Sequence, residues 1–225
     1  MPRLARVDVG NEIYHCINRA NGRLQIFNTR ADYELFEALM KEAQELTDMR
    51  IIGYVIMPNH WQLILQPRYD GDLALVMHAL CNTHTRRVHT TTKTIGHGHL
   101  YQGRYKSFLV ESDKYLLTLI KYVERNPVRA RLTKKCEEWK WGSAWRRTNG
   151  TPIQKKLIHP SPTPLPHGYL RWINTEDNLE EVERIRTSVN KGVPYGKETW
   201  MDAMIEKYHL ETTTRGAGRP RNTRT

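Results

Sequence analysis

The stretch MRIIGYVIMPNHWQLILQ, residues 49–66, contains the clearest indication of fold in the chain. Its first nine residues form an apolar run of strand length, and the proline-asparagine pair at 58–59 is typical of a turn. From His60 onward polar and apolar residues alternate, which places Trp61 and Leu63 on one face of a second strand. The stretch therefore predicts two adjacent strands, the second with one apolar and one polar face.

The flanking sequence extends this pattern in both directions. Apolar spacing predicts strands over residues 11–18 and 105–110, and helices over residues 29–47, 72–92 and from Ser112 or Asp113 up to Pro127, which ends or kinks the last one. The order of these elements predicts an α+β fold, with a ferredoxin-like split βαβ antiparallel sheet and helices on one face. This core is expected to span residues 1–147.

The composition changes after residue 147. Residues 148–175 are rich in proline and lack periodicity, as expected for a linker or a loop draped over the core. Residues 176–225 are expected to form a small helical appendage, with helices near 176–189 and 199–209 and a basic tail rich in glycine and arginine.

The balance of charge points to a polyanionic partner. The 225 residues carry a net charge of +11, which favours nucleic acid or an anionic membrane surface. No stretch approaches the ~20 apolar residues of a membrane-spanning helix, and the N-terminus does not resemble a signal peptide. The three cysteines are widely spaced and form no CxxC pair. We therefore expect a cytoplasmic protein without a membrane partner.

Two pairs of polar residues are candidates for a site. His60 and Gln62 stand two apart on a predicted strand, so they project from the same face and can reach one ion. Tyr122 and Asn126 stand four apart on the last core helix, about 40° from each other around its axis. Taken alone, each pair is better explained without a site, by a solvated sheet face for the first and by a half-buried aromatic with an asparagine at a helix end for the second.

A third feature is a long segment without acidic residues. Between Leu73 and Val110 there is no aspartate or glutamate, whereas basic residues stand at Arg86, Arg87, Lys93, Arg104 and Lys106. Such a segment favours contacts to a nucleic acid backbone over a merely solubilising face.

These segments together carry a family resemblance. MPNHWQLIL at 57–65 resembles the MPNHWHLxL segment of the HUH-type single-tyrosine transposases. GHLYQGRYKSFLVE at 98–111 and YVERNPVRARL at 122–132 are similar to the segments around their catalytic helix. GVPYG at 192–196, Trp200 and the final GRPR resemble the end of the REP-associated branch. The match covers nearly the whole chain in order.

The resemblance implies an HUH nuclease domain that nicks and rejoins single-stranded DNA hairpins such as REP-like repeats, with Mg²⁺ or Mn²⁺. Carried over by position, it implies Tyr122 as nucleophile, His60 as first metal ligand and Asn126 as a polar third ligand. A tyrosine nucleophile would leave a 5′-phosphotyrosine and a free 3′-hydroxyl, while the ion polarises the scissile phosphate.

One position departs from the family pattern. Gln62 stands where the second HUH histidine is expected, so the triad reads His-Trp-Gln. An amide oxygen suits Mg²⁺ or Mn²⁺, which favour oxygen ligands, but it is less rigidly aimed than an imidazole. The substitution leaves two outcomes open: cleavage with weaker metal binding, or DNA binding alone.

The resemblance also suggests where DNA is contacted. Besides the basic residues of the acid-free segment, the candidates are Lys121, Arg125, Arg129, Arg215, Arg219 and Arg221. The three in the tail resemble minor-groove-binding GRP segments. The REP-associated branch implies a monomer, with a dimer left open, and a nucleoid-associated location in a bacterial cytoplasm.

Two alternatives to an active nuclease remain. The first is a domesticated transposase that recognises repeated hairpins without cutting them, which Gln62 favours and Tyr122 opposes. The second is RNA binding by the open face of a ferredoxin-like sheet, which normally uses exposed aromatic residues. The face opposite Trp61 offers His60, Gln62, Ile64 and Gln66 instead, which disfavours base stacking.

Overall fold

The computed structural model describes residues 6–96 and 98–214. The strands in these residues are β1 (Ile13–Arg19), β2 (Arg50–Met57), β3 (His60–Gln66) and β4 (Lys106–Val110). They form one sheet in the order β2-β3-β1-β4, with every neighbouring pair antiparallel. Since a helix connects β1 to β2 and another connects β3 to β4, this is the predicted ferredoxin-like arrangement, which is confirmed.

Helices occupy much of the remaining described sequence. They are α1 (Arg30–Glu45), α2 (Asp72–Thr92), α3 (Lys114–Glu124), α4 (Asn126–Arg129), α5 (Ser143–Asn149), α6 (Pro152–Lys155), α7 (Tyr169–Asn174), α8 (Leu179–Lys191), α9 (Glu198–Lys207) and α10 (Glu211–Thr214). Within the described ranges, none of the helices has both the length and the apolar character that a membrane crossing requires.

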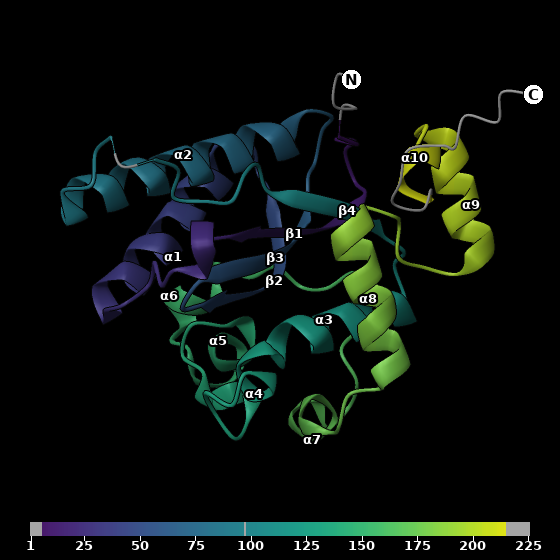
Figure 1. Cartoon of the computed structure of the whole chain (residues 1–225). Helices are drawn as coiled ribbons and strands as arrows, with labels where there is room; N and C mark the ends of the chain where they lie inside the picture. The colour runs from purple at the N-terminus through teal and green to yellow at the C-terminus, as the bar shows by residue number, and fades with distance from the viewer. Residues whose placement is uncertain (1–5, 97, 215–225) are drawn as a thin grey trace, which may run out of the picture.

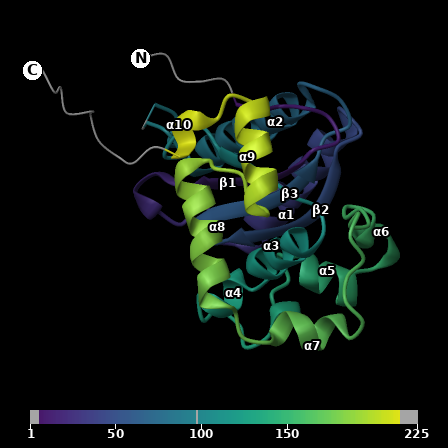
Figure 2. The same ribbon diagram turned by 90° about the vertical axis from the view of Figure 1, so that its right-hand side faces the viewer.

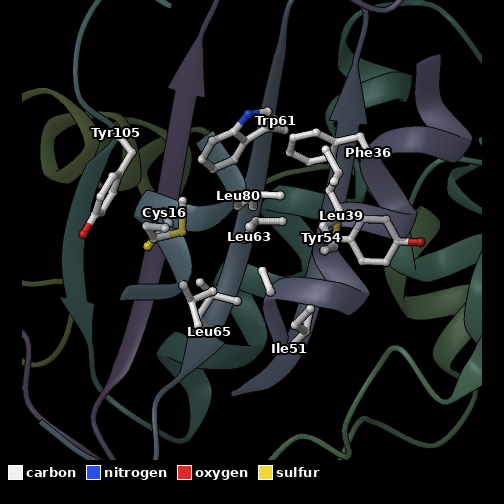
Figure 3. Close-up of a cluster of buried hydrophobic side chains, with 14 of the residues drawn as sticks. Cys16, Phe36, Leu39, Ile51, Tyr54, Trp61, Leu63, Leu65, Leu80 and Tyr105 are labelled. Atoms are coloured by element: carbon white, nitrogen blue, oxygen red, sulfur yellow. The ribbon is translucent and has the colours of Figure 1, made fainter. Parts of the chain in front are cut away.

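The first layer of helices, α1 and α2, covers the Trp61 face of the sheet (Figure 1). α1 begins where predicted, because Thr29 and Asp32 form a reciprocal capping box. Trp61 and Leu63 of β3 pack with Phe36 of α1 in a fully buried cluster (Figure 3). Each such side chain stabilises the fold by roughly 1.5–3 kcal/mol, so this layer fixes the orientation of β3.

The second face of the sheet is also covered, which corrects the expectation of helices on one face only. α3 packs against it through an apolar cluster that includes Leu119 and Ile120, and Ile64 of β3 belongs to the same cluster (Figure 1). The alternation in β3 suggested a solvated face because polar residues share it. In the structure His60 is 7% exposed and Gln62 is 2% exposed. These polar side chains are therefore buried on the face of the sheet that α3 packs against.

The helix before Pro127 is interrupted as predicted. α3 ends at Glu124, Arg125 caps it, and α4 starts at Asn126 with proline in its first turn. Proline lacks the N–H group that a continuous helix needs at this point. The interruption places Tyr122 on the last turn of α3 and Asn126 at the start of α4.

The C-terminal helix α8 packs along the β4 edge of the sheet. α8 is capped by the Asn178 side chain and contributes Ile185 to the α3 cluster. After α8, Tyr195 pairs in parallel with Val110 of β4 and is also buried in that cluster. Figure 2 shows α8 running along the side of the sheet from α7 to α9. The segment between α5 and α8 contains α6 and α7, and Leu157 within it joins the α1 layer of the core.

Candidate active site

The start of β3 presents the two candidate ligands to a single space. His60 follows the tight turn at Pro58 and Asn59, and its Nδ1 lies 2.8 Å from the Asn59 Oδ1 atom. The His60 Nε2 atom lies 3.4 Å from the Gln62 Nε2 atom. The Gln62 Oε1 atom lies 2.9 Å from Nε2 of His15, which is on the neighbouring strand β1. Three polar side chains thus form a chain of contacts across two strands.

The two imidazoles of this chain are neutral at physiological pH. Burial, reinforced by the charge of Arg19, lowers the pKa of His60 to about 3. Burial also lowers the pKa of His15 to about 4, against the opposing effect of its hydrogen bond to Gln62. Because a neutral imidazole is the form that binds metal ions, His60 is available as a ligand without losing a proton.

Tyr122 faces the same space from α3 and is held there by Arg129. The Arg129 guanidinium carbon lies 4.3 Å from the centroid of the Tyr122 ring, and the Arg129 side chain donates to the Tyr122 backbone oxygen. Arg129 itself pairs with Asp177 at 3.3 Å, and Asp177 also lies 3.0 Å from Arg125. The connection between α7 and α8 therefore fixes the helix end that carries the tyrosine.

A cleft of about 1060 Å³ contains all four predicted site residues, His60, Gln62, Tyr122 and Asn126. Its basic lining residues are Arg6, Arg19, Arg104, Lys106, Arg129, Arg186 and Lys191. Glu183 is the one acidic residue among its described lining residues. A cleft with this excess of positive charge suits a phosphodiester chain.

Comparison with known proteins identifies the family. The model of the IS200-like transposases matches residues 8–126 of the chain, which extends from just before β1 to the first residue of α4. The chain belongs to the IS200-like transposase family. The transposase is therefore a DNA-binding protein with a role related to transposition and the nuclease activity of that class.

Comparison with solved structures also gives matches. One is a REP-associated tyrosine transposase bound to a REP hairpin, which is 17% identical, with a match over 68% of this chain and 90% of that one and a TM-score of 0.55. Another, from Deinococcus radiodurans R1 and assigned as a transposase, is 16% identical over 58% of this chain and 92% of that one, with a TM-score of 0.39. No curated protein sequence matches the chain.

The other predicted DNA contacts are scattered. Arg86, Arg87 and Lys93 are exposed along and just after α2, on the opposite side of the sheet from α3. Lys121 donates to the Thr175 hydroxyl at 2.6 Å, and Arg125 donates to a backbone oxygen at 3.1 Å. These two cations are thus engaged within the protein. Arg215, Arg219 and Arg221 lie outside the described residues.

Several cleft residues were not predicted from the sequence. Arg19 enters the cleft because the β1–β3 register places it opposite His60. Arg186 and Lys191 enter it because α8 packs beside β4. No local pattern marks these residues, since each depends on pairing between segments far apart in the chain. His15 was also not predicted, because its partner Gln62 lies on another strand. A buried histidine within an apolar strand does, however, indicate that a polar partner lies nearby.

Buried histidines make the stability of the transposase dependent on pH. His84 is fully buried, and burial lowers its pKa to about 4, as it lowers those of His15 and His60. Unfolded histidine binds a proton near pH 6.5, so between pH 6.5 and 4 the unfolded chain binds more protons. Stability is retained above pH 6.5, and it falls by about 2 kcal/mol per buried histidine between pH 6.5 and 5.

This prediction is checked by thermal unfolding of the wild type and two variants between pH 7.5 and 5. His84→Gln is expected to reduce the loss of stability by about one third. His78→Gln, which changes an exposed histidine on the same helix, is expected to leave that loss unchanged. An identical pH dependence in the wild type and His84→Gln would contradict the argument.

Proposed function

We propose that the transposase nicks and rejoins single-stranded DNA hairpins through a phosphotyrosine intermediate at Tyr122. The observation that carries the proposal is the single basic cleft that contains Tyr122 together with His60, Gln62 and Asn126. In this reaction the Tyr122 oxygen bonds to the scissile phosphorus as the bond to the 3′ oxygen breaks. The phenol loses a proton, the leaving oxygen gains one, and a free 3′-hydroxyl results.

The residues of the chain supply binding and orientation for this step. Arg129 stacks on the Tyr122 ring and anchors its backbone, so the phenol is held at a fixed place in the cleft. Arg104 and Lys106 line one wall and are suited to bind the phosphates on either side of the scissile one. Holding the reacting groups in place is a large part of catalysis in such transfers.

The donor atoms present fit a divalent ion of the Mg²⁺ or Mn²⁺ type. His60 offers a neutral nitrogen and Asn126 an amide oxygen from the same cleft, and Gln62 would add its amide oxygen once that end of the amide turns away from His15. Within the described residues, no group of three or more His, Cys, Asp or Glu side chains is placed to hold an ion. When bound by these three residues, the ion would polarise the scissile phosphate.

A hairpin is the substrate that we propose. The GVPYG and GRPR segments resemble the end of the REP-associated branch, and a solved structure of the same fold is bound to a REP hairpin. Since His60 and Tyr122 of one chain meet in one cleft, we propose a monomer that acts on chromosomal repeats in the bacterial cytoplasm.

The direct test is formation of a covalent adduct. Purified protein is incubated with labelled hairpins carrying single-stranded flanks and Mn²⁺, and the products are separated under denaturing conditions. A labelled band at the mass of protein plus DNA fragment is the expected result. Hairpin binding without any adduct would support the alternative function of a domesticated repeat-binding protein, which the replacement of the second histidine by Gln62 favours.

The two walls of the cleft are expected to contribute to DNA affinity. Replacing Arg186 and Lys191 together by alanine should weaken hairpin binding on the order of 10-fold, since two phosphate contacts are lost. The slope of the logarithm of the affinity against the logarithm of salt concentration should fall by about 1.5–2.

Matched charge removals elsewhere on the surface distinguish this wall from a general electrostatic effect. Lys155→Ala with Lys156→Ala, two exposed residues at the end of α6, is expected to leave the salt slope unchanged. Arg86→Ala with Arg87→Ala measures the contribution of the α2 surface. Equal slopes for the α8 variant and the α6 variant would exclude α8 as a DNA contact.

A further inference from the structure

The Gln62 amide lies between two imidazoles, and its two ends are oriented differently. Its oxygen faces His15 Nε2 at 2.9 Å, and its nitrogen faces His60 Nε2 at 3.4 Å. The atom beside the metal-binding nitrogen of His60 is therefore an amide nitrogen. An amide nitrogen is a hydrogen-bond donor and offers no lone pair to a cation.

His15 determines which end of the amide faces it. The Nδ1 atom of its ring is buried without a hydrogen-bond partner. With the proton on Nε2, His15 donates to the Gln62 oxygen, and only an unprotonated nitrogen is left without a partner. His15 is 0% exposed and packs on Phe108, with 4.9 Å between ring centroids, so water and ring rotation offer no easy alternative.

Turning the Gln62 oxygen toward His60 requires a second change at His15. The amide nitrogen would then face His15 Nε2, which must accept a hydrogen bond, and the proton of His15 must move to Nδ1. That places an N–H donor in a buried position without an acceptor. Leaving one buried donor unsatisfied costs free energy. For an ion that binds the Gln62 oxygen, this cost corresponds to about a 5- to 150-fold weaker affinity.

We propose that His15 is a positioning residue that holds the Gln62 amide with its nitrogen toward His60, and thereby weakens divalent metal binding at the site. The proposal rests on the metal site of the proposed function. It assigns a role to a residue of β1, whereas the site residues that the family resemblance implies lie on β3, α3 and α4. It also accounts for the orientation in which Gln62 is found, with its oxygen engaged on the far side from His60.

The test is Mn²⁺ binding by the full-length protein without DNA, measured by calorimetry and by the electron paramagnetic resonance signal of free Mn²⁺. His15→Phe keeps a ring against Phe108 and removes the donor to Gln62. The expected result is binding at least 5-fold tighter than in the wild type. In a Gln62→Leu background, His15→Phe is expected to have no effect, because the amide that it releases is absent.

A measurement on the wild type covers the case in which His15→Phe does not fold. Proton–nitrogen correlation spectra of the histidine rings report which ring nitrogen of His15 carries the proton. The expected result is a proton on Nε2 without Mg²⁺ and on Nδ1 at saturating Mg²⁺. A proton that stays on Nε2 at saturation, or unchanged or weaker Mn²⁺ binding in His15→Phe, would overturn the proposal.

The failure of this inference is distinguishable from failure of the metal site itself. If Gln62→His binds Mn²⁺ tightly while His15→Phe matches the wild type, the metal site stands and the role of His15 is wrong. If neither the wild type nor Gln62→His binds Mn²⁺ at His60, both proposals are wrong. Loss of Mn²⁺ binding in His60→Ala identifies the site in each case.

Discussion

Replacing Tyr122 with phenylalanine is expected to abolish the covalent DNA adduct while hairpin affinity stays within about 2-fold of the wild type. The hydroxyl is the proposed nucleophile, and without it no oxygen of this residue can bond to phosphorus. Affinity is retained because the aromatic ring, its stacking with Arg129 and the basic walls of the cleft all remain. The adduct is measured on denaturing gels, and affinity by fluorescence anisotropy.

The neighbouring tyrosines provide the controls. Tyr105 lines the same cleft, and Tyr115 stands two turns earlier on α3, packed against Tyr195. Tyr105→Phe and Tyr115→Phe are each expected to form the adduct. An undiminished adduct in Tyr122→Phe, with loss of the adduct in one of these two, would assign the nucleophile to that residue.

Replacing Gln62 with histidine is expected to tighten Mn²⁺ binding by about 10- to 100-fold and to raise the nicking rate. The side chain projects from β3 beside His60, so an imidazole there supplies a second nitrogen donor from the same strand face. It also replaces an amide whose nitrogen faces His60. The range is that typical for changes in the immediate surroundings of a metal site.

Gln62→Leu is the matched control, since leucine is of similar size and removes every donor atom of the amide. Its Mn²⁺ affinity is expected to fall below that of the wild type. If Gln62→His folds and binds metal but nicks no faster, the glutamine is an adapted part of the site and its weak coordination does not limit the rate.

Local patterns in the sequence predicted most of the sheet and its first layer of helices. The alternation in β3 gave the buried Trp61 face, and Thr29 marked the start of α1. The same alternation led to the wrong prediction that the other face of β3 is solvated. It gave no means of telling polar residues in solvent from buried polar residues, and His60 and Gln62 are buried on the face that α3 packs against. Solvated and buried polar residues have the same period along a strand.

The structure brings the residues named from the family motifs into one cleft, whereas cleft residues contributed by distant segments were not predicted. His60 and Tyr122 lie in one cleft, as the family motifs implied. Lys121 and Arg125, by contrast, contact residues that no sequence motif indicates. Their partners come from the segment around Asp177, about fifty residues further along the chain, where nothing in the local sequence indicates a contact.

The order of the strands and helices along the chain also sets the order in which a newly synthesised molecule completes its sheet and its cleft. β1 leaves the ribosome first but lies in the middle of the sheet, so its backbone remains unpaired until β3 and then β4 have followed. Tyr122 follows on α3, after His60 and β4. The wall formed by Arg186 and Lys191 is made later still. A nascent chain thus carries the proposed nucleophile before all of its basic cleft residues are in place. A copy of the gene that stops before α8 would encode the four candidate-site residues without Arg186 and Lys191.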